Sequence, residues 1–203
     1  MRSITINELK KPFKCKRNSN CYALILIVNL IITLSIWFTS VIYSPHSFAQ
    51  IEEPTEYRLK TAFLYNFANF TEWPHIDKRG TFNMCFFDGN PFSSYLDYIT
   101  QKKVKDLHVA ILSKSDSDSL YDCHLLYISR SAAKDKLEKI LVSINNRSVL
   151  TVADSAGACQ KGVIINMGVD AGKITFEANL ASARIAELVL SSQLLRFAKE
   201  VYQ

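Results

Sequence analysis

The stretch T-F-N-M-C-F-F at residues 81–87 is apolar at nearly every position, and D-G-N-P follows it directly. A strand with one face in water alternates apolar and polar residues, whereas a strand covered on both faces is apolar almost throughout. Asp, Gly, Asn and Pro are residues that favour turns. Residues 81–87 therefore predict a strand inside a sheet that is covered on both faces.

Five further runs of the same kind lie downstream, at residues 107–112, 123–128, 148–152, 162–167 and 173–178. The last two flank V-D-A-G, where Gly172 can adopt the positive φ that a tight hairpin turn requires. Helical segments are interleaved with these strands. The alternation predicts an α/β fold: a single domain with a mostly apolar sheet of about six strands and helices on both faces.

The predicted helices have recognisable ends. One spans residues 54–72 and ends at the Trp73–Pro74 pair, because Pro74 disfavours the α conformation at the residue before it. A short helix spans residues 92–102, and Ser131 is expected to cap the next one. A long C-terminal helix is expected from about Ala181, because one stripe at helical spacing is mostly apolar: Ala183, Ala186, Leu190, Leu194, Phe197 and Val201.

Residues 1–49 have the layout of a secretory signal peptide. Six basic residues stand against Glu8 alone, an apolar run covers residues 21–42, and Ser47 and Ala49 are small residues before a cut at Gln50. A run of about 22 residues is also long enough to span a bilayer, so an uncleaved N-terminal anchor is the alternative. Both interpretations place residues 50–203 outside the cytoplasm, which predicts an exported, periplasmic domain.

The charge of the chain belongs to this leader. The chain has 24 basic and 19 acidic residues, and removing the leader's six basic residues and one acidic residue leaves 18 of each. A nucleic-acid-binding domain is expected to carry a basic face in its folded part. The neutral balance of residues 50–203 therefore argues against nucleic-acid binding.

Motifs for catalysis are missing from the sequence. It contains no G-x-S-x-G, no P-loop and no G-x-G-x-x-G. His75, His108 and His124 are isolated and do not form a metal-binding pattern. Asp154 and Glu177 could act as an acid–base pair, but nothing in the sequence separates their pKa values. We therefore expect no enzymatic activity, no cofactor and no metal.

Three cysteines lie beyond the leader. Cys85 and Cys123 fall in predicted strands, so they could join two elements of the sheet, while Cys159 lies in the loop-like A-G-A-C-Q-K-G. A bridge closing a loop of about 38 residues would stabilise the domain by about 4 kcal/mol in the chain-entropy model. We predict a Cys85–Cys123 disulfide; the alternative is three buried thiols.

Four segments together resemble the YfiR family of periplasmic proteins: Y-R-L-K-T-A-F-L-Y-N-F-A-N-F-T-E-W-P, V-L-T-V-A-D, G-V-I-I-N-M, and the ending K-I-T-F-E-A-N-L-A-S-A-R…S-S-Q-L-L-R-F-A-K. The resemblance covers residues 50–203 in order. It implies a non-enzymatic regulator that binds the periplasmic domain of an inner-membrane diguanylate cyclase and restrains it. Cyclic-di-GMP and biofilm formation would then fall, and an outer-membrane lipoprotein could sequester the repressor.

One departure from the family pattern concerns Cys159. It matches the first cysteine of a pair in the protein that gives the family its name, but Asn166 stands where the second would be. That disulfide cannot form in this chain, and the resemblance therefore leaves Cys159 unpaired. Redox control through such a bridge is not expected.

The helix predicted at residues 54–72 is aromatic or apolar on nearly every side. Such a helix is either buried on several sides or exposes part of its aromatic surface to a partner or a second copy in a homodimer. We expect Tyr65 and Phe67 to be the exposed interface candidates, and Phe63, Phe70 and Trp73 to be more buried. The alternative function is a periplasmic small-molecule binding or sensing module. It would use Asn179 and Arg184 where a strand meets a helix, although a helix cap or a turn hydrogen bond is the favoured role of Asn179.

Overall fold

The computed structural model describes residues 26–32, 53–77, 79–116 and 118–203. The chain divides into two units, residues 1–47 and 48–203. Residues 26–32 are helical, whereas the basic N-terminus and the cleavage motif predicted in residues 1–49 lie outside the described residues. No helix within the described ranges has both the length and the apolar character that a membrane crossing demands.

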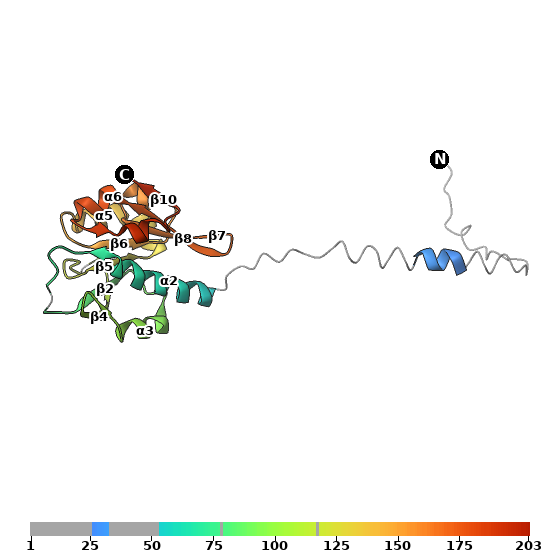
Figure 1. The fold of residues 1–203 in the computed structure, drawn as a ribbon, viewed down its shortest axis with the longest axis horizontal. Helices are drawn as coiled ribbons and strands as arrows, with labels where there is room; N and C mark the ends of the chain where they lie inside the picture. Colours follow the sequence, from blue (N-terminus) through green and yellow to red (C-terminus); the bar gives the residue numbers. More distant parts are fainter. Residues whose placement is uncertain (1–25, 33–52, 78, 117) are drawn as a thin grey trace, which may run out of the picture. The chain divides into compact units, whose positions relative to one another are not determined.

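An eight-stranded sheet organises the second unit, in the order β10-β8-β7-β6-β5-β2-β4-β3 (Figure 1). Its centre is five parallel strands: β4 (Leu107–Lys114), β2 (Phe82–Phe87), β5 (Leu125–Ile128), β6 (Leu150–Ala153) and β7 (Ile165–Asp170). Antiparallel pairs join β8 (Lys173–Asn179) to β7 and β3 (Lys103–Val104) to β4, and β10 (Glu200–Tyr202) runs parallel to β8. The predicted α/β fold is confirmed, with two short edge strands added to the six expected.

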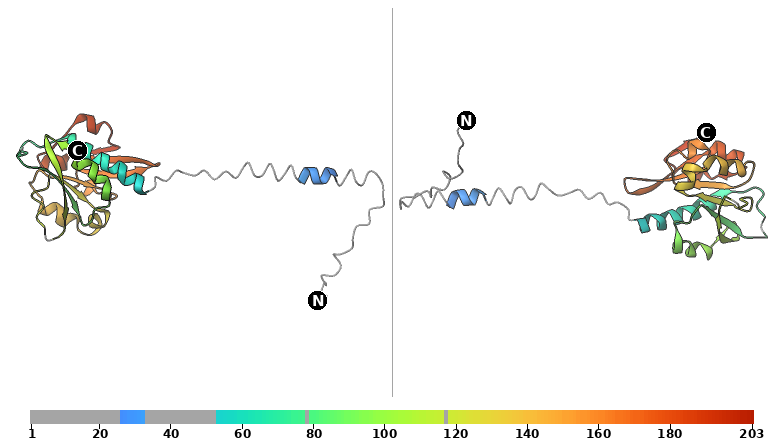
Figure 2. Two further views of the ribbon diagram at one scale, coloured as in Figure 1. Left: turned by 90° about the horizontal axis from the view of Figure 1, so that it is seen from below. Right: turned by 180° about the vertical axis from the view of Figure 1, so that it is seen from behind.

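The hairpin of β7 and β8 extends beyond the neighbouring strand. Strand β6 pairs with only Ile165 and Asn166, so the remainder of β7 has β8 as its neighbour on one side alone (Figures 1 and 2). The turn is formed by Ala171 and Gly172, with φ of 46° and 75°. Two successive positive φ values match the twist of the flanking strands, and the expectation for Gly172 is confirmed.

Helices pack on both faces of the sheet. They are α2 (Glu53–Asn69), α3 (Asp97–Thr100), α4 (Arg130–Asp135), α5 (Leu137–Ser143), α6 (Leu180–Ile185) and α7 (Ser192–Leu195), with 3-10 turns at Ser93–Leu96 and Cys159–Lys161. One buried cluster contains residues of α2, α3, α6 and α7, and a second contains residues of α4 and α5. Strands β5 and β6 are buried along their whole length and β2 at every position except Asn83, as their apolar runs require.

Two predicted helix boundaries were wrong. Helix α2 ends at Asn69, before the Trp73–Pro74 pair, because residues 71–72 form β1 (Thr71–Glu72) against β9 (Val189–Leu190). Helix α4 is capped by Ser129, whose hydroxyl accepts from the backbone N–H of Ala132, and not by Ser131. The chain turns into this helix directly after β5 ends at Ile128, which leaves Ser129 in the capping position.

The long C-terminal helix was also wrong. Helix α6 ends at Ile185, and Glu187 adopts a positive φ of 55° before β9. Ser191 then caps α7 by accepting from the N–H of Leu194, and Lys199 donates its N–H to Phe176 as the chain enters β10. The predicted stripe is still mostly buried, but through three short elements: Ala183, Ala186, Leu190 and Leu194 are at most 9% exposed.

Candidate interaction surface

Helix α2 buries one side completely against the sheet. Leu64, Phe67 and Ala68 are 0% exposed and belong to the first core cluster. The Phe67 ring stands edge-on to Phe176 of β8, with ring centroids 5.1 Å apart. Aromatic pairs in this geometry add to the free energy gained from burial. The aromatic content of α2 is therefore largely explained by packing.

Phe63, Asn66 and Phe67 of α2 line a hollow that we call the aromatic groove. Its volume is about 400 Å³. Its walls come from the end of α2, from β8 and from α7 with the residues after it: Phe63, Asn66, Phe67, Phe70, Phe176, Gln193, Leu194, Arg196 and Phe197. Five of these nine side chains are aromatic, and Arg196 supplies a positive charge at the wall.

Two aromatic residues of the groove are exposed. Phe197 has 80% of its surface in solvent and Phe70 has 37%, while Phe63 is half-buried. Single exposed apolar side chains are common, but aromatic residues gathered around a hollow indicate an interaction site. The aromatic groove is the described surface best suited to bind an apolar partner.

The interface residues predicted from sequence are placed differently. Phe67 was expected to be exposed and is fully buried, so that prediction was wrong. Tyr65 is half-buried and lies on another side of α2, where its hydroxyl donates to the carbonyl of Lys103 at 3.2 Å. Phe70, expected inside, is exposed instead. Trp73 is buried as predicted, and its indole N–H donates to the carbonyl of Ser148.

Asn179 and Arg184, the predicted ligand residues, have structural contacts. The Asn179 side chain caps α6 by accepting from the N–H of Ser182 at 2.8 Å, and its amide donates to the carbonyl of Cys159 at 2.8 Å. Arg184 is exposed and donates to the carbonyl of Leu180, one turn earlier. Because both polar atoms of Asn179 are engaged, the capping alternative describes this residue.

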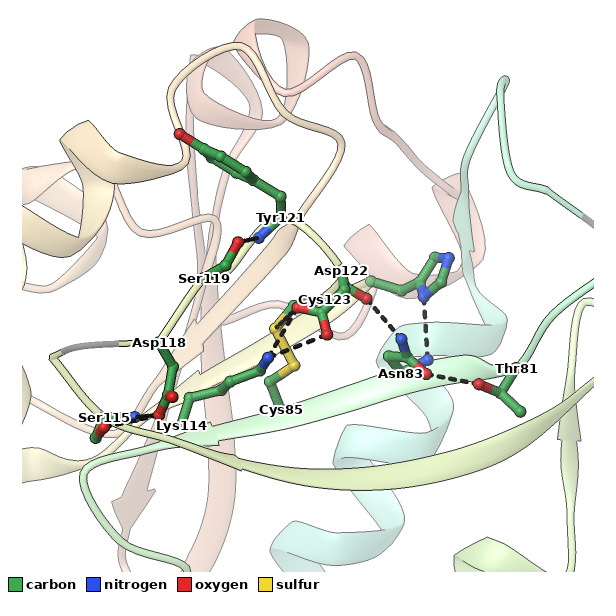
Figure 3. The surroundings of a disulfide bond; sticks show 11 residues. Thr81, Asn83, Cys85, Lys114, Ser115, Asp118, Ser119, Tyr121, Asp122 and Cys123 are labelled. Carbon is green, nitrogen blue, oxygen red and sulfur yellow. Dashed lines mark hydrogen bonds and ion pairs between the residues drawn. A yellow bond between two sulfur atoms is a disulfide. The ribbon is translucent and has the colours of Figure 1, made fainter.

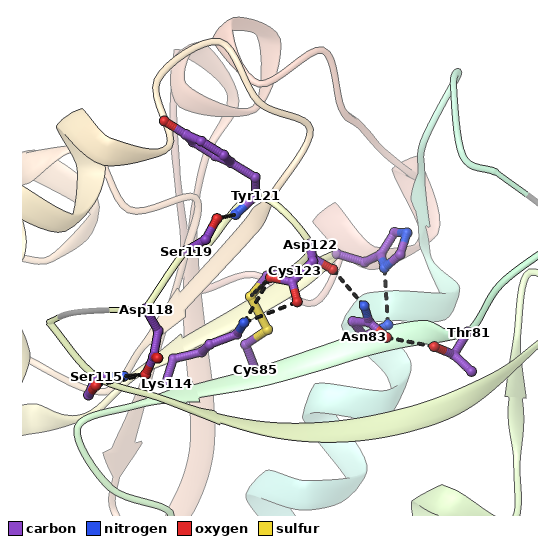
Figure 4. A network of polar contacts seen from close by, with 11 residues as sticks. Thr81, Asn83, Cys85, Lys114, Ser115, Asp118, Ser119, Tyr121, Asp122 and Cys123 are labelled. Atoms are coloured by element: carbon purple, nitrogen blue, oxygen red, sulfur yellow. Dashed lines mark hydrogen bonds and ion pairs between the residues drawn. A yellow bond between two sulfur atoms is a disulfide. The ribbon is translucent and has the colours of Figure 1, made fainter.

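The predicted disulfide is present. Cys85 in β2 and Cys123, just before β5, are bonded across adjacent strands with Cα atoms 5.8 Å apart, a normal separation (Figure 3). Beside it, Lys114 pairs with both carboxylate oxygens of Asp122, and Asn83 donates to the Asp122 carbonyl (Figure 4). The single group of potential metal ligands found within the described residues is Cys85, Cys123 and Asp122, and its two sulfurs form this bond.

Cys159 is a buried free thiol. Burial, with a smaller contribution from the charge of Glu177, raises the pKa of Cys159 to about 12. A thiol that stays protonated at neutral pH is a poor nucleophile. Asn166, which stands at the position of the missing second cysteine, accepts from the N–H of Ser155 and donates to Glu177 at 3.4 Å. The Asn166 side chain thus joins the loop after β6 to β8.

A second hollow, which we call the polar cavity, lies where β6 ends beside α2 and β7. Its volume is about 760 Å³. In its wall, the Lys60 amino group contacts Glu56 at 2.5 Å and Asp154 at 2.8 Å, although the Lys60 side chain is only 1% exposed. Burial alone would lower the pKa of Lys60, but hydrogen bonds to Asp154 and Glu56 outweigh it and raise that pKa.

Sequence reasoning identified Asp154 and Glu177 but missed Lys60 and Arg130. Asp154 and Glu177 both line the polar cavity, and Arg130 contacts Asp154 at 3.3 Å. Lys60 and Asp154 are 94 positions apart, so no local spacing links them. Burial of Tyr127, and then the negative charge of Asp154, raises the pKa of Tyr127. These charged residues come together only in the folded protein, where they form a wall of the polar cavity.

Comparison of the chain with models of protein families identifies its family. A family model described as YfiR/HmsC-like matches residues 57–199, which is most of the chain. The protein belongs to the YfiR/HmsC-like family. The match includes most of α2, all residues that line the aromatic groove, and all residues that line the polar cavity except Glu56. The family is regulatory rather than catalytic, which agrees with the sequence. No curated protein matches the chain in sequence.

Proposed function

We propose that this protein is a periplasmic regulator that binds the periplasmic domain of an inner-membrane diguanylate cyclase and holds the enzyme inactive. The aromatic groove, with Phe197 exposed beside it, is the observation that carries this proposal. Family membership supports it, and so does the neutral charge of residues 50–203. Lower cyclic-di-GMP and reduced biofilm formation are the expected consequences in the cell.

The contact is expected to be mainly apolar. Burying Phe197 and Phe70 against a partner would remove aromatic surface from water, and such residues dominate the binding free energy of interfaces. Apolar contacts are much less sensitive to salt than charge pairs are. Arg196, at the groove wall, can pair with a carboxylate on the partner and fix its orientation. Binding should therefore persist at high ionic strength.

Inhibition requires a preference between two states of the cyclase. A regulator that binds the active and inactive states equally well shifts neither. To move most of the population into the inactive state, the inactive form must bind more tightly by several kcal/mol. An outer-membrane lipoprotein that covers the aromatic groove would relieve this inhibition by competition.

Deletion of the gene and a Phe197→Ala variant test this function together. Both should raise cellular cyclic-di-GMP, since the variant removes the most exposed aromatic side chain of the groove. Tyr121→Ala is the matched control, because Tyr121 is 61% exposed and lies outside the groove. Cyclic-di-GMP that is unchanged by the deletion would reject the proposed function. A response to the deletion but not to Phe197→Ala would reject the groove as its site.

A further inference from the structure

We propose that the polar cavity binds a small molecule that carries a protonated primary amine on a short hydrocarbon body. The cavity, at about 760 Å³, is within the size range of small-molecule sites. It lies past the end of β6, one of five parallel strands, and open α/β sheets bind ligands outside the carboxyl ends of their strands. This cavity shares Phe176 with the aromatic groove, but none of its charged residues lines that groove.

The charges of the cavity wall favour a cation. Four acidic residues line it against three basic ones, and each basic residue already has an acidic partner. Lys60 contacts Glu56 and Asp154, Arg130 contacts Asp154, and Lys199 contacts Asp170 at 2.6 Å. Glu177 is the remaining acid: its side chain has one hydrogen-bond donor among the described residues, the Asn166 amide at 3.4 Å, and its charge acts on Lys199, which already pairs with Asp170. A ligand ammonium would supply the missing positive charge.

Asp154 adds a buried negative charge to the cavity wall. Its side chain is 2% exposed, and its Oδ2 atom is held by Lys60 and Arg130, whereas Oδ1 has no hydrogen-bond partner in the described part of the chain. Buried polar atoms are almost always paired, so such an atom calls for an explanation. Tyr127 supplies part of that explanation, because a hydrogen bond to Asp154 adds to the burial that raises the pKa of Tyr127, so Asp154 offers the cavity its negative charge rather than a free acceptor.

The remaining wall fits a hydrocarbon body. Met167 and Phe176 line the cavity and are buried in the first core cluster. Beyond Asn166, the edge of β7 that faces away from β8 has no neighbouring strand, because pairing with β6 ends there. A short alkyl chain can lie against this apolar wall while its ammonium group reaches a carboxylate. Aliphatic amines and diamines have this chemistry.

Calorimetric titration of the purified protein with butylamine and putrescine tests the site. We expect saturable binding of at least one amine, while 1,4-butanediol and succinate, which lack the ammonium, do not bind. Glu177→Gln should weaken binding about tenfold or more, since a charge-assisted hydrogen bond is lost. This variant leaves the Lys60–Asp154 contact intact, so its folding should be preserved. Glu187→Gln removes an exposed charge outside the cavity and serves as the matched control.

Three outcomes would overturn the proposal. They are no saturable binding of either amine, binding that Glu177→Gln leaves unchanged, and binding of succinate in preference to the amines. None of these results bears on regulation of a cyclase, which is read from cyclic-di-GMP in cells. Failure of the amine site and failure of the proposed function are therefore distinguishable.

Discussion

The two halves of α2 are held in the domain by different interactions. In the first half, Lys60 is buried between Glu56 and Asp154, a contact that depends on named partners and geometry. In the second half, Phe67 is buried by aromatic packing, and neighbouring rings extend past the core into the aromatic groove. The ion pairs of the first half are buried and offer little surface to a partner. The aromatic residues around Phe67 are only partly covered, so Phe70 and Phe197 expose apolar surface at the groove. The partner surface therefore belongs with the second half.

Truncating Phe67 should have the largest effect. Phe67 is 0% exposed and contacts Phe63 and Phe176, so Phe67→Ala removes buried surface and leaves a cavity. We expect the free energy of unfolding to fall by about 3–5 kcal/mol. Urea denaturation measures it. A loss below about 1 kcal/mol, typical of surface positions, would show that the second half of α2 is not held by this ring.

The ion pair of the first half should be the next most sensitive. Lys60→Met leaves Asp154 with Arg130 as its only ionic partner, and that side chain is 70% exposed. We expect a loss of about 3 kcal/mol, because a buried charge is then poorly compensated. The double variant Lys60→Met/Asp154→Leu should lose less than the single one, since no charge remains buried. Additive losses in a double-mutant cycle would show that the pair is not coupled.

The sequence predicted the sheet better than it predicted these two halves. Strands such as 81–87 are recognisable because burial on both faces makes them apolar without alternation. The C-terminal stripe misled because Ala183, Ala186, Leu190 and Leu194 are buried in short elements that happen to keep helical spacing. Ser191, a cap inside the predicted helix, was the overlooked signal.

The sites were harder to predict for a physical reason. Helical periodicity sorts the residues of α2 into stripes, but it does not show which stripe meets the sheet, so the burial of Phe67 could not be predicted. Phe197 is exposed because the chain leaves α7 for β10, a turn that only the structure shows. Lys60 and Asp154 meet only after α2 packs across the end of β6. The Cys85–Cys123 bond was predictable because both residues fall in predicted strands, although only the structure shows that these strands are adjacent.

Alkaline pH should remove the stabilisation that the buried Lys60 supplies. The pKa of Lys60 is raised above its ordinary value of 10.5, so the folded protein holds this proton more tightly than the unfolded chain does. The stabilisation is complete below that value and is lost as pH rises through the folded pKa. The pKa of Tyr127 is also raised, which acts in the same direction. Urea unfolding across this range should show a shallower decline for Lys60→Met than for the unchanged protein. Equal declines would exclude a contribution from Lys60.

The smallest stability effect, and the sharpest test of the comparison, is expected at Phe197. Because Phe197 is 80% exposed and lies outside both core clusters, Phe197→Ala should change the free energy of unfolding by no more than about 0.5 kcal/mol. If the side chain anchors a partner, the same substitution should weaken that complex by about 2 kcal/mol or more. Thermal denaturation and titration of the purified cyclase periplasmic domain measure the two quantities on the same preparations.

A large loss of stability would show that Phe197 packs in the fold, and it would remove the contrast between the halves of α2. A stable variant that binds the domain as tightly as the unchanged protein would instead show that the exposed rim of the groove is not the contact surface.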